Sequence, residues 1–385
     1  MPRCKILSVG IKGAESRNFR SAVMGGFFAR FLLLLLLAAV NPPVSRAFLF
    51  EGIRPLGMGN AFTAVADDEH AIFYNPAGLS YITGLTAGAV TPWFGMARHS
   101  ADFIGDGIDT NLNDSDDIAH LIRRYTGKPQ YAAAGVFPYM GFDISGTGML
   151  FGVLANATME IEIRNPVWTE SHVMLNRDIA PLAGAGTKLP AAEWLRVGVA
   201  LKYLHRTSLN ETYTPGQITS NNFERIVADD LNSGTGFSFD IGALYDFPAH
   251  LLPFFDTLRF GVAGINIPEM SMGDATGIRH QVNLGMALEK HVKPWCRVIG
   301  ALDFQDATYN AIDGNQLSRR VHMGMEIRFP YVSLRTGIHH GYLSAGGTID
   351  LKYFKMDFAT YALEKGAYAG QKPNRRYLAR IFLGW

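Results

Sequence analysis

Apolar side chains alternate with small or charged ones most clearly in the segment Leu195-Arg196-Val197-Gly198-Val199-Ala200-Leu201-Lys202-Tyr203. In an extended strand successive side chains point to opposite faces, so one face here is apolar and the other is small or charged. A membrane barrel needs this pattern, because its outer face meets lipid and its inner face meets a polar lumen. A half-buried strand of a soluble protein looks the same, so this segment alone leaves both folds open.

Similar segments follow one another along the chain from residue 84. They are rich in Gly, aromatic and β-branched residues, and clusters typical of turns separate them. Short connections such as Phe329-Pro330-Tyr331 contrast with long polar ones at 97–129 and 209–233, an asymmetry typical of barrels. The sequence predicts an all-β fold, a transmembrane antiparallel β-barrel of about 14 strands over residues 84–385. The expected strands are 84–96, 130–139, 147–163, 167–183, 193–208, 234–247, 257–266, 278–290, 295–305, 319–329, 331–338, 345–353, 354–363 and 376–385.

The composition indicates a chain that does not face water alone. It is 48% hydrophobic and 18% charged, whereas soluble domains carry about 25% charged residues. The net charge of +1 provides no concentrated basic face, so nucleic acid is excluded as a partner. One of the two cysteines, Cys4, lies in the predicted targeting segment, which leaves Cys296 without a partner for a disulfide or a cysteine-ligated metal.

Residues 1–47 are expected to form a secretion signal. Basic residues precede the apolar run 31–40, which is too short to span a bilayer as a helix. Ser45 and Ala47 provide the small residues of a cleavage site after Ala47, and the long basic region leaves Met24 as an alternative start. No later stretch contains 18 apolar residues, so the chain exported by the Sec pathway is either soluble or a barrel of the Gram-negative outer membrane.

The last expected strand ends the chain on an aromatic residue, after a loop at 366–373. A terminal aromatic inside an alternating strand resembles the signal that the outer-membrane assembly machinery reads. We therefore expect that machinery and outer-membrane lipids as partners. The face that would carry the signal consists of Tyr377, Ala379, Ile381, Leu383 and Trp385.

Two motifs precede the first strand: Gly57-Met58-Gly59-Asn60-Ala61-Phe62-Thr63-Ala64-Val65-Ala66-Asp67-Asp68 and Phe73-Tyr74-Asn75-Pro76-Ala77-Gly78-Leu79. They resemble the start of the mature FadL-type long-chain fatty-acid transporters and, equally, of the related PorV-like and TraF-like outer-membrane barrel proteins. The resemblance covers residues 51–79, and the rest of the chain agrees only in its pattern. It implies that residues 48–83 form a hatch inside the lumen of a fourteen-stranded barrel.

Backbone chemistry suits these residues to a compact plug. Glycine permits tight turns and close packing, proline stiffens a bend, and asparagine bonds neighbouring backbone groups. The segment Asn75–Gly78 therefore favours a plug turn over a ligand contact, and Gly57–Gly59 lacks the third glycine and preceding strand of a nucleotide site. The candidate hatch residues are Gly57, Met58, Gly59, Asn60, Phe62, Asn75, Pro76, Ala77 and Gly78.

The long loop at 106–128 predicts a short helix after Ser115 that caps the barrel mouth. Packing on neighbouring loops is favoured over binding of apolar solutes as the role of this helix. Asp109 begins a sequence similar to a calcium loop, but Asp114 replaces the required glycine and His120 the required glutamate. The apolar helix positions are Ile118, Leu121, Ile122 and Tyr125.

No enzymatic, cofactor or metal site is predicted. The histidines show no motif typical of a catalytic triad, although triads are spatial rather than sequential. His339 and His340 lie where a turn is expected, so a solvated loop is favoured there over a metal site.

The favoured function is passage of small hydrophobic molecules, such as long-chain fatty acids, across the outer membrane. The resemblance implies capture near the mouth, a shift of the hatch and lateral exit through a kinked wall strand. The alternative is a non-transporting PorV-like scaffold that assists protein secretion or surface attachment. A pocket that leads to a wall opening would favour transport, and a sealed lumen would favour the scaffold. A secreted β-sandwich, the third possibility, would lack a lipid-facing belt.

Overall fold

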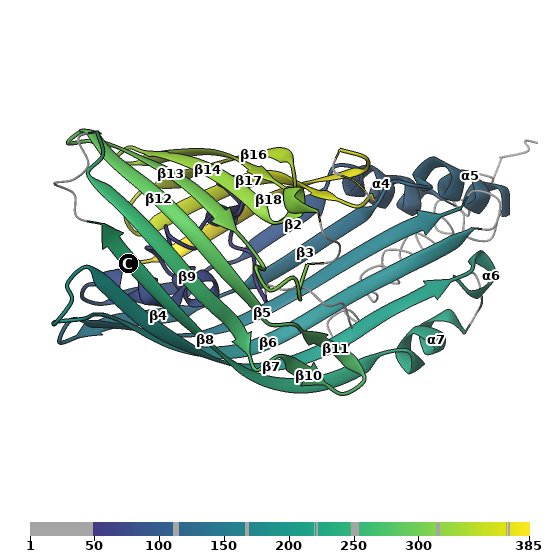
Figure 1. Ribbon diagram of the computed structural model, residues 1–385. Helices are drawn as coiled ribbons and strands as arrows, with labels where there is room; N and C mark the ends of the chain where they lie inside the picture. The colour runs from purple at the N-terminus through teal and green to yellow at the C-terminus, as the bar shows by residue number, and fades with distance from the viewer. Residues whose placement is uncertain are drawn as a thin grey trace, which may run out of the picture.

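The computed structural model describes residues 49–110, 115–165, 169–218, 220, 222–247, 254–312, 316–366, 368 and 370–385. The predicted secretion signal at 1–47 lies outside the described residues. Long strands form a closed wall, and short helices gather at one end of it (Figure 1). Within the described ranges, none of the helices has the length and apolar character needed to cross a membrane.

The wall is a single antiparallel sheet of 16 strands that closes on itself through the pairing of β5 with β6. β1 and β2 both pair with β18, and β3 and β4 both pair with β5, so each of these pairs forms one kinked wall strand. The wall therefore has 14 strands, which confirms the predicted fold class. The bounds are β1 (Thr86–Val90), β2 (Trp93–Ala97), β3 (Gln130–Val136), β4 (Tyr139–Ile144), β5 (Thr147–Arg164), β6 (Glu170–Lys188), β7 (Leu195–Tyr213), β8 (Asn232–Phe247), β9 (Thr257–Ile267), β12 (Gln281–Lys293), β13 (Cys296–Phe304), β14 (Val321–Arg328), β15 (Val332–His339), β16 (Tyr342–Asp350), β17 (Phe354–Glu364) and β18 (Pro373–Gly384).

The two ends of the barrel differ. One end, which we call the turn end, has short connections such as those between β14 and β15 and between β16 and β17. The other, the loop end, carries α4 (Ser100–Asp109), α5 (Ser115–Tyr125), α6 (Pro215–Ile218) and α7 (Phe223–Asp229) (Figure 1). A two-stranded hairpin of β10 (Met270–Met272) and β11 (Ala275–Ile278) and a short turn of helix, η3 (Leu317–Arg319), lie in other loops. In outer-membrane barrels short turns face the periplasm and long loops face outward.

The outer face of the wall is apolar. In β18 the side chains of Tyr377, Ile381 and Leu383 are exposed, Ala379 is half-buried, and the alternate residues point into the barrel. This alternation with a closed sheet excludes the soluble β-sandwich, because a sandwich buries such a face against a second sheet. Exposed aromatic residues at the turn end form a girdle: Trp194, Trp295, Phe329, Tyr331, Tyr353 and Trp385.

The chain from residue 49 to 83 lies inside the wall. It contains α2 (Ile53–Gly57), α3 (Ala71–Tyr74) and the 3₁₀ helix η1 (Pro76–Tyr81), and most of it is buried. α2 packs on β15 to β18, whereas η1 packs on β5 to β8, so the segment contacts opposite parts of the ring. We call residues 49–83 the hatch.

Several strand boundaries differ from the sequence expectation, and two of these differences have a clear local cause. β18 begins at Pro373, which was assigned to a loop, because proline is tolerated as the first residue of a strand. β12 begins at Gln281 rather than at residue 278, because Ile278 instead ends the β10–β11 hairpin.

Candidate functional site

The first glycine-rich turn of the hatch presses against the wall. Gly59 and Asn60 both have positive φ, and a Cβ on Gly59 would lie 2.3 Å from the carbonyl oxygen of Met323. Only glycine fits this approach. Tyr74 donates a hydrogen bond of 2.6 Å to Asn60 Oδ1, and Gln305 Nε2 donates one of 2.8 Å to the Asn60 carbonyl. Met58 and Phe62 are fully buried beside this turn.

The second turn of the hatch is bonded through Asn75. Its Nδ2 donates to the Thr63 carbonyl at 2.9 Å and to the Ala243 carbonyl of β8 at 3.2 Å. Its Oδ1 accepts from the Ala77 backbone N–H at 3.2 Å, which fixes the bend at Pro76. A Cβ on Gly78 would overlap the Ala66 carbonyl. These contacts belong to the packing of the hatch and leave Asn75 no free group for a ligand.

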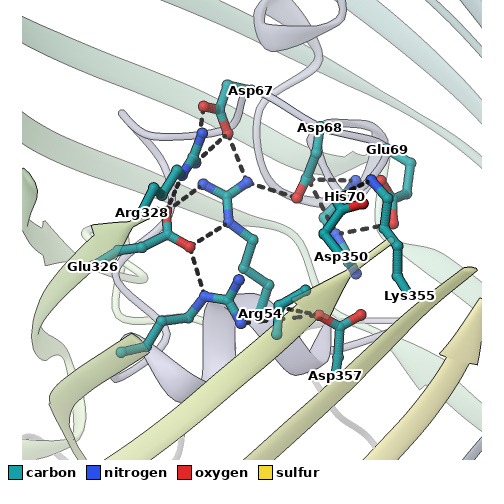
Figure 2. Close-up of polar contacts among 12 residues, drawn as sticks. Arg54, Asp67, Asp68, Glu69, His70, Glu326, Arg328, Asp350, Lys355 and Asp357 are labelled. Carbon is teal, nitrogen blue, oxygen red and sulfur yellow. Dashed lines mark hydrogen bonds and ion pairs between the residues drawn. The ribbon is translucent and has the colours of Figure 1, made fainter. Parts of the chain in front are cut away.

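A set of buried ion pairs ties the hatch to the wall (Figure 2). Arg54 Nη1 lies 2.6 Å from both Asp67 and Asp68, and its Nη2 lies 2.9 Å from Glu326 of β14. On the other side Arg380 of β18 bridges Glu69, at 2.6 Å, and Asp357 of β17. We call this set the latch; its members are Arg54, Asp67, Asp68, Glu69, Glu326, Arg328, Arg335, Asp357 and Arg380.

The surroundings of Asp68 favour its charged form. Burial opposes the charge on Asp68, but His70 and Arg54 outweigh it and hold the pKa of this carboxyl well below its ordinary value of 3.8. Asp68, Glu69 and His70 are also a group whose potential ligand atoms lie within 4.8 Å of one another. Because arginines already neutralise both carboxylates, this group fits an ion-pair network better than a metal site.

The wall has a break between its first two strands. Backbone pairing joins β1 to β4 up to Gly88 and Tyr139, and it joins β2 to β3 from Trp93 and Gly135. The residues between, 89–92 and 136–138, contain Pro92 and Pro138, which have no N–H to donate to a ladder. Across this break, which we call the seam, the Phe137 N–H donates to Thr91 Oγ1 at 2.8 Å.

Aromatic rings from the hatch close the seam from inside. Phe50 lies 5.5 Å from Trp93 and 5.2 Å from Phe73, measured between ring centroids. Phe73 in turn lies 5.0 Å from Phe137, and Phe137 lies 5.5 Å from Tyr139. The seam is therefore blocked by side-chain packing rather than by backbone hydrogen bonds.

A cavity of about 40 Å³ adjoins the seam. One side is largely apolar and includes Phe50, Trp93 and Tyr131, and the other side is polar. Tyr131 also lines a smaller pocket of about 10 Å³ beneath α4, whose other walls include Phe103 and Met159. The polar side consists of Asn156, Thr158, Asn176, Asp178 and Arg206, in which Asp178 and Arg206 pair at 2.7 Å.

Near the loop end, a second apolar cluster lies on the outer face of the wall, because its strand residues share the face of the exposed Phe151 and Val199. It joins the outer halves of β5, β6 and β7 to α7. We call it the mouth cluster; it consists of Met159, Leu175, Leu209, Tyr213 and Val227, with Ala132, Ile161, Val173, Phe223, Ile226 and Leu231 packed against it.

Solved structures share this architecture at low sequence identity. The Ralstonia pickettii toluene transporter TbuX has a TM-score of 0.51 and 10% identity, with 90% of this chain and 98% of that chain covered. The monoaromatic hydrocarbon channel CymD has a TM-score of 0.52 and 12% identity, with 88% and 98% covered. A TodX deltaS2S3 mutant monoaromatic hydrocarbon channel has a TM-score of 0.51 and 10% identity, with 87% and 98% covered. This chain has the FadL-type barrel fold. No protein-family model matches the sequence, and no curated protein is significantly similar to it.

The expected mouth helix is present in this FadL-type barrel as α5. Tyr125 is buried, donates a hydrogen bond of 2.6 Å to Asp106 and packs edge-on against Phe103 of α4 at 5.0 Å. Leu121 and Ile122 are half-buried, and the side chain of Ile118 lies outside the described residues. The helix thus packs on its neighbouring loop.

One expectation about the barrel is wrong. His339 and His340 do not form a solvated loop: His339 ends β15 with only 1% of its surface exposed, next to the fully buried His322. The ring centroids of His339 and His340 are 4.4 Å apart. Burial and the nearby cationic groups lower the pKa of His340 to about 3. The turn is short, so the wall and the hatch cover these rings.

Sequence reasoning missed the residues that contact the hatch from the wall. Glu326 and Arg380 give no local signal, because their hatch partners, Arg54 and Glu69, are hundreds of positions away along the chain. A usable signal is nonetheless present: charged residues occur at inward positions of β14, β17 and β18, and the hatch motif carries Asp67 and Asp68.

Proposed function

We propose that this FadL-type barrel passes small hydrophobic molecules across the outer membrane and releases them sideways through the seam. The observation that carries the proposal is the break in the wall beside Trp93, where a lumen cavity and the seam share one side chain. Sideways release suits an apolar molecule, because it enters lipid without crossing a polar turn end.

The route to the seam begins in the inner cavity. Phe50 of the hatch and Trp93 of the wall both line this cavity. Trp93 also borders the seam, so its ring is a gate between the cavity and the break in the wall.

The structure corresponds to a closed resting state. A cavity that binds benzene measures about 150 Å³, whereas the inner cavity measures about 40 Å³. Leu49 and Phe50 line it and precede the part of the hatch that the latch holds, so they can move while the latch stays intact. Each aromatic contact that Phe50 gives up costs about 0.5–1.5 kcal/mol, which a bound ligand can replace.

The substrate class follows from the lining of this route. Asp178 and Arg206 neutralise each other, and the other charged side chain of the lining is the acidic Glu51, so the cavity offers no net positive charge to attract a small anion. Long-chain fatty acids and monoaromatic hydrocarbons are the two candidates. The second is the class named for the neighbouring channels.

Quenching of Trp93 fluorescence tests the proposal. The mature protein, folded in detergent, is titrated with a nitroxide-labelled long-chain fatty acid, and toluene is then added as a competitor. We expect saturable quenching that Trp93→Phe abolishes and that Trp194→Phe, a change in the exposed girdle, retains. If toluene abolishes the quenching, long-chain fatty acids and monoaromatic hydrocarbons bind at a common site.

The alternative is a non-transporting PorV-like scaffold, and the latch is the observation that favours it. So many buried ion pairs resist displacement of the hatch as a whole, as expected for a permanently closed barrel. Absence of saturable quenching in protein that shows the heat-modifiable gel mobility of a folded barrel would reject transport and support the scaffold.

A further inference from the structure

We propose that His322 Nδ1, His339 Nδ1 and the Gly59 carbonyl oxygen form a binding site for a divalent transition-metal ion that links the hatch to the wall. The pairing of Met323 with Ile338 places His322 and His339 side by side on β14 and β15, at the loop end of their ladder. Both side chains are buried. The site is separate from the route proposed for hydrophobic molecules and does not depend on that function.

Three electron-pair donors meet at this point. His322 Nδ1 lies 2.8 Å from the Gly59 carbonyl oxygen and 3.2 Å from His339 Nδ1. Two nitrogen ligands of a tetrahedral zinc ion, each about 2.0–2.1 Å from the metal, lie about 3.3 Å apart. The separation of the two imidazole nitrogens therefore matches neighbouring ligands of one ion.

The second nitrogen of His322 determines which atom is free to bind. Its Nε2 lies 3.2 Å from the Arg319 carbonyl oxygen, so the tautomer with its proton on Nε2 donates a hydrogen bond there. Nδ1 then presents a lone pair to Gly59 and His339. Metal-binding histidines use their other N–H in this way, with a backbone carbonyl as the acceptor.

Hydrogen bonds within the protein satisfy the ring nitrogens of His322 and His339 poorly. A neutral His322 carries one proton, but both of its nitrogens face carbonyl oxygens, so each tautomer leaves two acceptors facing each other. His339 Nε2 is buried without a hydrogen-bond partner among the described residues. A cation at Nδ1 removes the conflict, because it accepts electron pairs from all three atoms.

The neighbourhood tolerates a cation. The nearby guanidinium of Arg376 is paired with Glu160 at 2.8 Å, and that of Arg320 is paired with Asp306. Imidazole nitrogen favours Zn²⁺, Cu²⁺ and Ni²⁺, whereas Ca²⁺ and Mg²⁺ need several oxygen ligands that this site lacks. His340 stacks on His339, and its buried Nδ1 has no hydrogen-bond partner in the described chain. It can supply a further nitrogen if its ring turns.

Cobalt provides the direct test, because Co²⁺ occupies zinc sites and absorbs visible light when nitrogen ligands surround it. The mature folded protein is titrated with Co²⁺, and its unfolding midpoint is measured with and without the ion. We expect Co²⁺ to bind at one saturable site and Zn²⁺ to displace it from that site. The unfolding midpoint should be higher in the presence of the metal.

His322→Gln and His339→Gln should each weaken Co²⁺ binding at least tenfold and remove the metal-dependent rise in midpoint. His291→Gln, a change at an exposed histidine, is the matched control and should leave both signals intact. Heat-modifiable gel mobility establishes that each variant is folded. Absence of saturable binding by the unaltered protein, or equal binding by folded His322→Gln and His339→Gln variants, would overturn the proposal.

Discussion

Arg54 is the residue through which the hatch is held most directly. It contacts two hatch carboxylates and one wall carboxylate, and its guanidinium also lies over the Phe62 ring at 4.8 Å. Removing one partner of a buried ion pair strands the others, at a cost of about 3–5 kcal/mol. A buried arginine in this position therefore matters more than any exposed ion pair on the loops.

We predict that Arg54→Met loosens the hatch by an amount in that range. The variant should have a lower unfolding midpoint and should be cleaved faster within residues 49–83 by a protease. Arg225→Met is the control, because the Arg225 side chain is 84% exposed and its ion pair with Asp229 spans 3.8 Å. Equal effects of the two substitutions would contradict the inference that the latch holds the hatch in place.

Asp68 should make the hold on the hatch depend on pH. A carboxyl whose pKa is lowered on folding stabilises the folded state above its unfolded pKa, and this stability is lost as the pH falls through the folded pKa. For Asp68 the loss begins below the ordinary value of 3.8. The difference in unfolding midpoint between the unaltered protein and Asp68→Asn should be largest at neutral pH and should shrink below that value. A difference that is constant with pH would refute this assignment.

At the scale of elements, the kinked wall strands and the hatch rings act together. The β1–β2 and β3–β4 strands lose their backbone pairing at the seam, and Phe50 and Phe73 replace it with ring packing. The seam is therefore the part of the wall that opens at the lowest cost, since no ladder hydrogen bonds need to break there.

Phe50→Ala should open this path. Loss of the ring enlarges the inner cavity and removes the contact with Trp93, so uptake of a hydrophobic probe by cells should rise several-fold. Phe254→Ala, at an exposed ring of the turn end, should leave uptake unchanged. A fall in uptake with Phe50→Ala would show that this ring guides the molecule rather than blocks it.

The last strand supports a prediction about assembly. Trp385 joins the last strand to the first through backbone hydrogen bonds of 2.7 and 2.9 Å with Ala87. Any residue can make these backbone bonds. The aromatic ring of Trp385 is 56% exposed, and it is the feature that the expected recognition signal requires. Trp385→Ser should lower the amount of folded barrel in the outer membrane several-fold, as seen by immunoblot. Trp295→Ser, at a girdle ring that is 58% exposed, should not.

The strands could be predicted from the sequence because their signal is local. Alternation in β7 and β18 needs only neighbouring residues, and the predicted ranges agree with the observed strands apart from a few boundary residues. The hatch region was recognisable from its motif. The resemblance implied a kinked wall strand, but it did not locate the seam. The latch and the histidine pair could not be predicted, because each joins residues, such as Arg54 and Glu326 or Gly59 and His322, that only the closed barrel brings together.

At the scale of the whole molecule, the barrel combines an apolar exterior with a lumen that is filled by its own N-terminal segment. The latch fixes the hatch in the turn half, while Leu49 and Phe50 end it beside the seam. The loop half contains the mouth cluster. This division separates a firmly held plug from a small displaceable end, which is the arrangement that sideways release requires.

The central claim is tested most directly by measuring uptake when the external concentration of the solute limits its rate of entry. Cells without a hydrophobic-compound transporter of their own are given this protein, and entry of a radiolabelled long-chain fatty acid, toluene and a hydrophilic solute of similar size is timed. The account predicts faster entry of at least one hydrophobic compound, no change for the hydrophilic one, and a further increase with Phe50→Ala. Equal rates with and without the folded barrel for both hydrophobic compounds would contradict it.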